Sequence, residues 1–270
     1  EVHLGGGLPT IAAVGLANSS VREGIDRIRA ALSHSGFKLP QHRVTVNLAP
    51  ADIRKEGASL DLPIAAAILG ADSRLGGAPA RDIVLAGELA LDGAVRPVRG
   101  VLAIALAARA AGRRGVLVPS ANVAEALLVP GIQVWRAGSL ADAIALLKDP
   151  TCIEESRVEH VVEEADVAET PCEDLADVRG QHAARRALEV AAAGGHHLLL
   201  TGPPGSGKTM LARRLRGILP PLAHEEALEV TRIWSAAGQA SGLVRHRPFR
   251  APHHGVSLAG LIGGGEALRP

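Results

Sequence analysis

The chain has 270 residues, a formal net charge of +1 and 47% hydrophobic residues, enough apolar material for one large domain or two ordinary ones. Only 1% of the residues are aromatic, so aliphatic side chains must fill the core. No apolar run reaches the roughly 18 residues of a membrane span, and no signal peptide opens the chain. The two cysteines, Cys152 and Cys172, are expected as free thiols in a reducing compartment. We therefore expect a cytoplasmic protein with no membrane partner.

Charge is distributed unevenly along the chain. Residues 152–177 hold ten acidic residues and one Arg and lack apolar periodicity, which is typical of a linker. Residues 178–270 hold twelve Lys or Arg against five acids, a balance that suits polyanionic ligands such as nucleotides or nucleic acid. An ordinary solvated surface is the alternative that charge leaves open. We expect a domain over 1–148, an acidic linker over 149–176 and a second domain over 177–270.

The first of these parts alternates strand and helix patterns and predicts a compact α/β domain. Asp61 is expected to cap a short apolar helix, with Pro63 in its first turn. Asp92 and Gly93 form a strong turn signal between two strands. The expected strands cover 10–16, 44–48, 83–91, 94–98, 116–118 and 132–135, and the expected helices cover 20–33, 62–69, 101–111, 122–127 and 140–147.

The C-terminal part predicts three helices, over 181–193, 208–216 and 225–236. Between the first two lies a short apolar run, 197–201, which predicts a strand. Residues 238–270 are rich in Gly, Pro, His and Arg and are expected to form loops or hairpins.

Residues 202–209 fit the G-x-x-x-x-G-K-[S/T] pattern of a phosphate-binding loop throughout, between the expected strand and helix. Glycines let the backbone approach phosphate oxygens, and the loop N–H groups can form an anion nest at the positive end of the helix dipole. We expect Lys208 to reach the β- and γ-phosphates and Thr209 to ligate Mg²⁺. The predicted nucleotide-binding residues are Gly202, Pro203, Pro204, Gly205, Ser206, Gly207, Lys208, Thr209 and Met210.

The C-terminal part resembles the magnesium-chelatase-type branch of the AAA+ ATPases at 174–181, 183–200 and 248–265. The resemblance implies ATP and Mg²⁺ as ligands, places Val178 and Gly180 near the adenine, and makes 248–265 an insertion near the ring pore. The acidic Walker B strand end and the arginine finger of such an ATPase are expected beyond Pro270. The catalytic residues therefore stay unknown, and the chain as given is expected to bind ATP without hydrolysing it.

The N-terminal part resembles the proteolytic domain of Lon, at 55–59 and 87–100. The resemblance aligns Ser59 with the Lon nucleophile, but the matching position of the general-base lysine falls at Ile104. Arginines stay protonated and cannot replace that base, so we expect no proteolysis. The chain is expected to combine an inactive Lon-like domain, which shares its fold with a ribosomal protein, and a partial AAA+ domain.

The order of these two domains resembles the ComM/YifB family. That resemblance implies a hexameric, ATP-driven DNA motor that acts in branch migration during natural transformation. A magnesium-chelatase-like ATPase that remodels proteins or metal-insertion complexes is the alternative, and an ATP-dependent serine protease is a third reading. The candidate DNA contacts are basic side chains that could bind phosphates, namely Arg245, Arg247, Arg250, His253 and His254.

Overall fold

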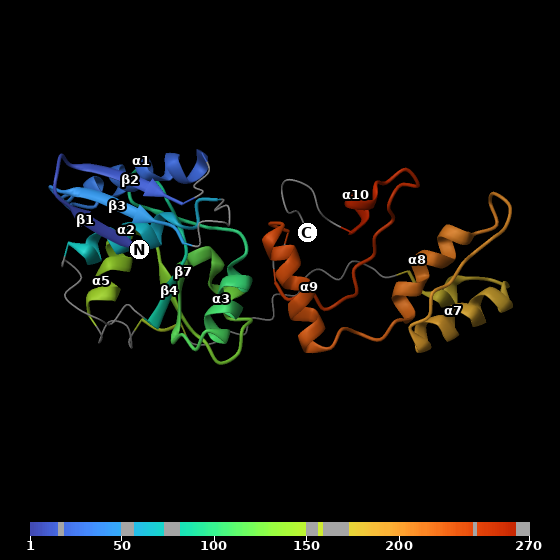
Figure 1. The fold of residues 1–270 in the computed structure, drawn as a ribbon. Coiled ribbons are helices and arrows are strands. Elements are labelled where there is room, and N and C mark those ends of the chain that lie inside the picture. The colour runs from blue at the N-terminus through green and yellow to red at the C-terminus, as the bar shows by residue number, and fades with distance from the viewer. Residues whose placement is uncertain are drawn as a thin grey trace. The chain divides into compact units, whose positions relative to one another are not determined.

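The computed structural model describes residues 1–15, 19–49, 57–72, 82–149, 156–158, 173–239 and 242–262. These residues form two compact units, one of 1–163 with Ser235–Gln239 and one of 164–234 with 240–270 (Figure 1). Each unit is described by itself below. Most of the expected acidic linker lies outside the described residues, so its boundaries at 149 and 176 stay a prediction.

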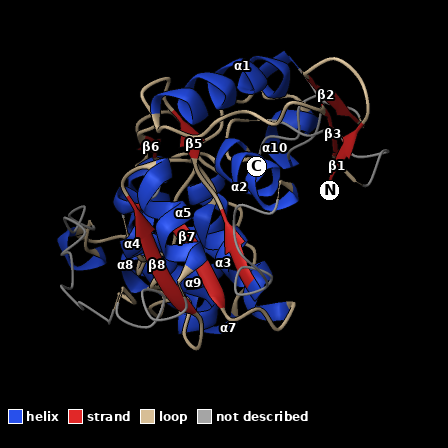
Figure 2. Cartoon of the chain, turned by 90° about the vertical axis from the view of Figure 1, so that its left-hand side faces the viewer, coloured by secondary structure: helices blue, strands red, loops and turns tan. Residues whose placement is uncertain are grey.

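The first unit contains two three-stranded sheets and a short hairpin (Figure 2). In the sheet β1-β3-β2, β1 runs antiparallel and β2 parallel to β3, with Leu4 opposite Val44 and Val2 opposite Val46. The sheet β4-β7-β8 is parallel throughout. The strand bounds are β1 Val2–Gly5, β2 Thr10–Val14, β3 Arg43–Asn47, β4 Ile83–Leu85, β5 Glu88–Leu89, β6 Val95–Arg96, β7 Gly115–Pro119 and β8 Gln133–Ala137.

Helices pack on both sheets, and strands of both sheets contribute to one large hydrophobic core. The alternation of β3 buries Val44 and Val46, as predicted, and Trp135 of β8 is fully buried in the same cluster. The Arg114 guanidinium lies over the Trp135 ring, 5.5 Å from its centroid. The helix bounds are α1 Ser19–His34, α2 Asp61–Ala71, α3 Val101–Ala110, α4 Val123–Ala126 and α5 Leu140–Lys148, with a 3-10 turn, η2, at Ser120–Asn122.

The single strand predicted over 83–91 is observed as two strands, β4 and β5, with a break at Gly87. The Gly87 N–H donates to the Ser59 carbonyl, and the Leu62 N–H donates to the Gly87 carbonyl, so the backbone leaves the sheet here. A Cβ at Gly87 would lie 2.8 Å from the Val95 side chain, which explains the glycine. The turn is as predicted: Gly93 has a φ of 85°, and β5 pairs antiparallel with β6.

Asp61 does not cap α2 as expected. Leu60 occupies the cap position, and no side chain caps the helix. The Asp61 carboxylate instead accepts from Arg27 Nε at 2.8 Å and Nη2 at 3.3 Å, and from the Leu89 N–H at 3.3 Å. Asp61 is 2% exposed, so this ion pair joins α1, α2 and β5 inside the unit. Burial raises the pKa of the Asp61 carboxyl, against the hydrogen bonds and charge of Arg27, which lower it.

The second unit consists of helices joined by loops. Its small core gathers Leu175, Val178, Leu188 and Leu211. The element bounds are η3 Leu175–Asp177, α7 His182–Gly194, α8 Lys208–Ile218, α9 His224–Ala236, which ends in the first unit's residues, and α10 Leu258–Ile262. In the described part of the chain, no helix has both the length and the apolar character needed to cross a membrane.

The strand predicted over 197–201 is wrong: these residues precede the phosphate loop without strand structure. A strand is defined by pairing, and the described residues of this unit include no strand with which the segment could pair. Leu199 is 84% exposed as a result. The apolar run alone was therefore not enough to predict a strand, because a strand also needs a pairing partner.

Candidate nucleotide-binding site

The phosphate loop predicted over 202–209 leads directly into α8. Gly202, Gly205 and Gly207 have φ values of 156°, 78° and 83°, backbone conformations that L side chains rarely adopt. Gly207 also precedes the first residue of α8, in the left-handed conformation. The glycines of the pattern are therefore required by the backbone path of the loop.

The Lys208 ammonium folds across the loop from the start of α8. Its Nζ donates to the Gly202 carbonyl at 2.8 Å, to the Pro203 carbonyl at 2.7 Å and to Ser206 Oγ at 3.3 Å. No acidic residue occurs in 202–209, so the charge held over the loop is positive. The loop thus concentrates one fixed cation among backbone groups.

The donors of this site fit a polyphosphate. The first N–H groups of α8 have no acceptor within the helix, and the helix dipole places partial positive charge at the same end. The hydroxyl-bearing Thr209 is exposed in the first turn, and Met210 beside it is 37% exposed. Ammonium, hydroxyl and backbone donors at one helix start are the groups that bind phosphate oxygens.

The segment before α7 lies against this loop. Val178, expected near the adenine, has its side chain buried in the core at 3% exposed, and its carbonyl accepts from Arg185 Nη1 at 3.3 Å. Gly180 is exposed with a φ of 71°. The next residue, Gln181, donates from Nε2 to the Ser206 carbonyl at 3.2 Å. The structure thus brings this segment to the loop, and adenine contact stays a prediction.

Sequence reasoning missed two side chains that brace the site, Gln181 and Arg214. Arg214 of α8 is 14% exposed, pairs with Glu173 at 2.8 Å and donates to the Asp174 carbonyl at 3.0 Å. It fastens the end of the acidic stretch to the helix that carries Lys208. The sequence did contain a signal for the ion pair of Arg214, because the acidic run before residue 178 is complementary in charge to the Arg-rich helix α8.

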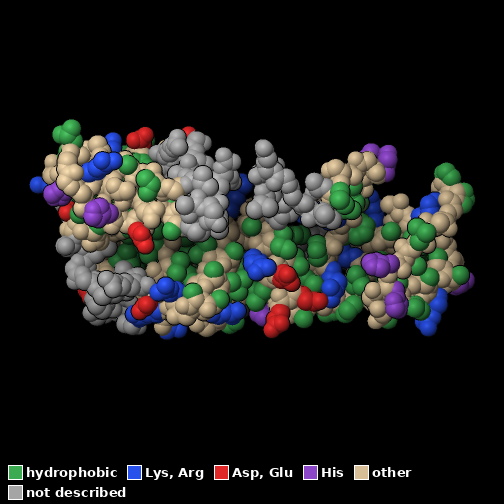
Figure 3. Space-filling view, in the orientation of Figure 1, with side chains coloured by type: hydrophobic (Ala, Val, Ile, Leu, Met, Phe, Trp, Pro, Cys, Tyr) green, Lys and Arg blue, Asp and Glu red, His purple; other side chains and the backbone are tan. Residues whose placement is uncertain are grey.

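The candidate DNA contacts differ in their surroundings. Arg247 donates from Nη2 to Glu226 Oε2 at 3.0 Å and from Nε to the Pro220 carbonyl at 2.9 Å, so it is engaged within the unit. Arg245 and Arg250 are exposed. On the face seen in Figure 3, acidic and basic side chains are mixed over α9. DNA contact by these residues remains a prediction.

The rings of the two adjacent histidines of this segment lie against each other at an interplanar angle of 38°. The His253 and His254 ring centroids are 4.0 Å apart, and His253 Nδ1 accepts from the Gly255 N–H at 3.1 Å. Within the described ranges, no group of three or more His, Cys, Asp or Glu side chains could hold a metal ion. The pair therefore belongs to a local turn in the exposed segment.

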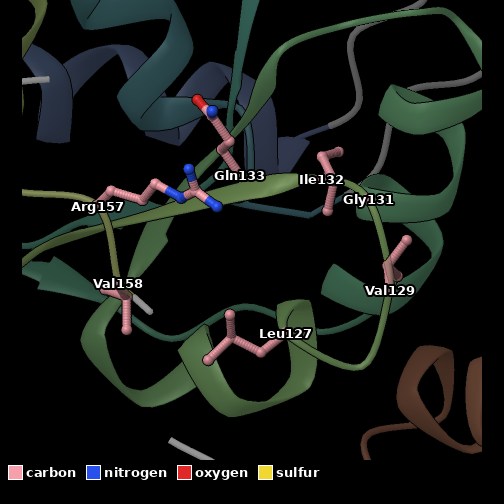
Figure 4. A pocket seen from close by; sticks show the side chains of 7 residues that line it. All are labelled: Leu127, Val129, Gly131, Ile132, Gln133, Arg157 and Val158. Carbon is pink, nitrogen blue, oxygen red and sulfur yellow. The ribbon is translucent and has the colours of Figure 1, made fainter. Parts of the chain in front are cut away.

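The first unit has a hollow of about 410 Å³ beside the edge strand β8 (Figure 4). Residues 156–158 run along this strand, and the Val158 N–H donates to the Val134 carbonyl at 2.9 Å. The lining combines apolar side chains with Arg157 and Gln133, which lie at one side. The lining residues are Leu127, Val129, Gly131, Ile132, Gln133, Arg157 and Val158.

The Lon-type serine has no base in the matching helix of this unit. Ser59 is half-buried in the turn before α2. The helix α3 carries Ile104 at the position expected for the lysine, and its ionisable residue is Arg109. The helix α3 thus carries no lysine that could act as the general base, and the absence of proteolysis stays a prediction.

Two family models match the chain and together cover most of it. Residues 174–270 match the family described as magnesium chelatase, subunit ChlI, and residues 1–122 match the family described as subunit ChlI of Mg-chelatase. The YifB protein of Salmonella typhimurium is 44% identical over 272 residues, which cover 100% of this chain and 53% of that protein.

The chain belongs to the ComM/YifB family. The competence protein ComM of Haemophilus influenzae is 42% identical over 278 residues, which cover 100% of the chain and 53% of that protein. The chain spans about half the length of the curated relatives it matches. Lon protease 2 of Sorangium cellulosum is 36% identical over 102 residues, 36% of the chain and 12% of that protein.

Family membership confirms the predicted α/β architecture. A ChlI domain comes first, and the start of a magnesium-chelatase-type AAA domain follows. The ComM/YifB family is magnesium-chelatase-like and of the AAA ATPase type, so it implies ATP as the nucleotide.

Proposed function

We propose that the chain binds ATP with Mg²⁺ at Gly202–Met210, and that the full-length protein is an ATP-driven motor that assembles as a hexamer and moves DNA branches. The loop geometry carries this proposal: three left-handed glycines, the Lys208 ammonium and the start of α8 converge on one place. Thr209 would hold Mg²⁺ through its hydroxyl. The DNA role is supported by similarity to a relative named a competence protein.

We further propose the division of labour expected from the sequence, with 1–148 as a proteolytically inactive Lon-like domain, 149–176 as a linker and 177–270 as the ATP-binding domain. The Lon-like part would serve assembly or DNA engagement. The absence of a lysine from α3 supports an inactive domain.

ATP turnover by the full-length protein tests the motor. We expect single-stranded or forked DNA to raise the ATPase rate several-fold, and Lys208→Ala to abolish the turnover with and without DNA. Turnover that ignores DNA would favour the alternative, a chelatase-like ATPase that remodels proteins. Degradation of casein by the protein would favour the protease instead.

Arg250→Ala tests whether the exposed basic segment binds DNA phosphates. One neutralised phosphate accounts for about 0.7 of the slope of log affinity against log salt for single strands and about 0.9 for duplex DNA. We expect Arg250→Ala to lower the slope by about one such unit, measured by fluorescence anisotropy between low and moderate salt. The control is Arg186→Ala, which removes an equal charge from an exposed site on α7, outside both the basic segment and the Lon-like part. An unchanged slope in Arg250→Ala would remove this residue from the DNA interface.

A further inference from the structure

Gln181 has an unusual backbone conformation. Its φ of 48° is the one positive value at a non-glycine residue in the described part of the chain. It follows Gly180 and occupies the N-cap position directly before α7, and its carbonyl accepts from the Arg185 N–H at 2.9 Å. The left-handed region is unfavourable for an L residue with a Cβ, whereas glycine adopts it without a steric penalty. A glutamine at this position therefore points to a task for its side chain.

The side chain of Gln181 reaches the phosphate loop. Its Nε2 donates to the Ser206 carbonyl at 3.2 Å, across 25 residues of sequence. A Cβ placed on Gly207 would lie 3.1 Å from the same Nε2, so the amide also lies close to the Gly207 backbone. The residue that precedes α7 thus contacts the peptide that joins Ser206 to Gly207.

That peptide links the turn of the loop to α8. The Ser206 N–H donates to the Pro203 carbonyl at 3.3 Å, and Ser206 Oγ accepts from Lys208 Nζ. A trans peptide is planar, so its C=O and N–H point in opposite directions. Holding the Ser206 carbonyl toward Gln181 therefore turns the Gly207 N–H away from Gln181.

We propose that Gln181 is a positioning residue for the nucleotide: its amide fixes the Ser206–Gly207 peptide so that the Gly207 N–H is held ready to donate to a phosphate oxygen. This inference rests on the proposed binding of ATP at the loop. Without the amide, the peptide can rotate, and part of the binding energy must be spent on ordering it. Gln181 acts through the loop and does not itself contact phosphate.

Substitutions at Gln181 separate this role from a purely structural one. Gln181→Gly removes the amide and suits the left-handed backbone. Gln181→Asn also tolerates that backbone but is one methylene too short to reach Ser206. For both variants we expect affinity of the full-length protein for a fluorescent ATP analogue with Mg²⁺ to fall about fivefold to tenfold, which corresponds to one net hydrogen bond. The melting temperature of nucleotide-free Gln181→Gly should stay equal to or above that of the wild type.

The outcomes distinguish the inference from the function on which it rests. Unchanged affinity in both variants, or an affinity loss that follows a fall in melting temperature in each, would overturn the positioning role while leaving ATP binding intact. If the wild type does not bind the analogue, or if Lys208→Ala binds it equally well, the proposed function fails and the inference fails with it. Should Gln181→Gly not fold, Gln181→Asn decides.

Discussion

Lys208→Ala is expected to weaken the binding of MgATP by the full-length protein at least 100-fold. A hydrogen bond to a charged group contributes about 1.5–3 kcal/mol, and Lys208 would reach both the β- and the γ-phosphate. Two such contacts correspond to about 3 kcal/mol or more, where each 1.4 kcal/mol is tenfold. Calorimetric titration of nucleotide into the variant and the wild type measures the loss.

The same substitution should hardly change stability. Nζ donates to the exposed Gly202 and Pro203 carbonyls, which water can satisfy once the ammonium is gone. We expect the melting temperature to move by less than about 2 °C. Lys148→Ala is the matched control, because it removes an equal charge from an exposed site at the end of α5. An equal affinity loss in both variants would show that net charge, and not the loop, governs binding.

Asp61→Ala is expected to lower the free energy of unfolding of the first unit by about 3 kcal/mol. Asp61 is the buried partner of a part-buried ion pair, so its removal leaves the Arg27 charge without its carboxylate, and the buried Leu89 N–H also loses its acceptor. Asp61→Asn keeps an acceptor oxygen for both donors and should cost less. Urea unfolding followed by circular dichroism measures both variants, and equal stability of Asp61→Ala and the wild type would contradict a structural role for the pair.

The pH dependence of the free energy of unfolding provides a second test of the Arg27–Asp61 pair. Because burial raises the pKa of Asp61, the folded chain binds the proton more tightly than the unfolded chain does. The contribution of this group to stability is therefore greatest below the unfolded pKa of about 4 and falls as the pH rises through the folded pKa. Asp61→Asn should remove that part of the slope.

Local sequence patterns predicted most helices and strands because the interactions that specify these elements lie within a few residues of one another. Valines alternating along β3 and the Asp92-Gly93 turn each specify a conformation within a few residues. The phosphate loop was predicted for the same reason, since its eight residues carry both the glycines and the donors. Long-range partners were not predictable in this way. Nothing near Asp61 in sequence indicates that Arg27, 34 residues earlier, turns a predicted cap into a buried ion pair.

The same limit applies to the site. The partners of Arg214, Glu173 and the Asp174 carbonyl, lie about forty positions away in the sequence. Gln181 and Ser206 are separated by 25 residues, and their contact follows from the packing of α7 on α8. The failed strand over 197–201 shows the converse case, because strand formation depends on a neighbour that an apolar run cannot supply.

The scarcity of aromatic residues gives the two units separate optical labels. The chain has no Tyr and two Trp, so its near-ultraviolet emission comes from indole alone. Trp135 is fully buried beneath the Arg114 guanidinium in the first unit, and Trp234 is half-buried in the second. Replacing either Trp by Phe leaves the other as a fluorescent reporter of its own unit. In Trp135→Phe, the remaining Trp234 reports the melting of the nucleotide-binding unit without a dye, and the first unit contributes no indole emission.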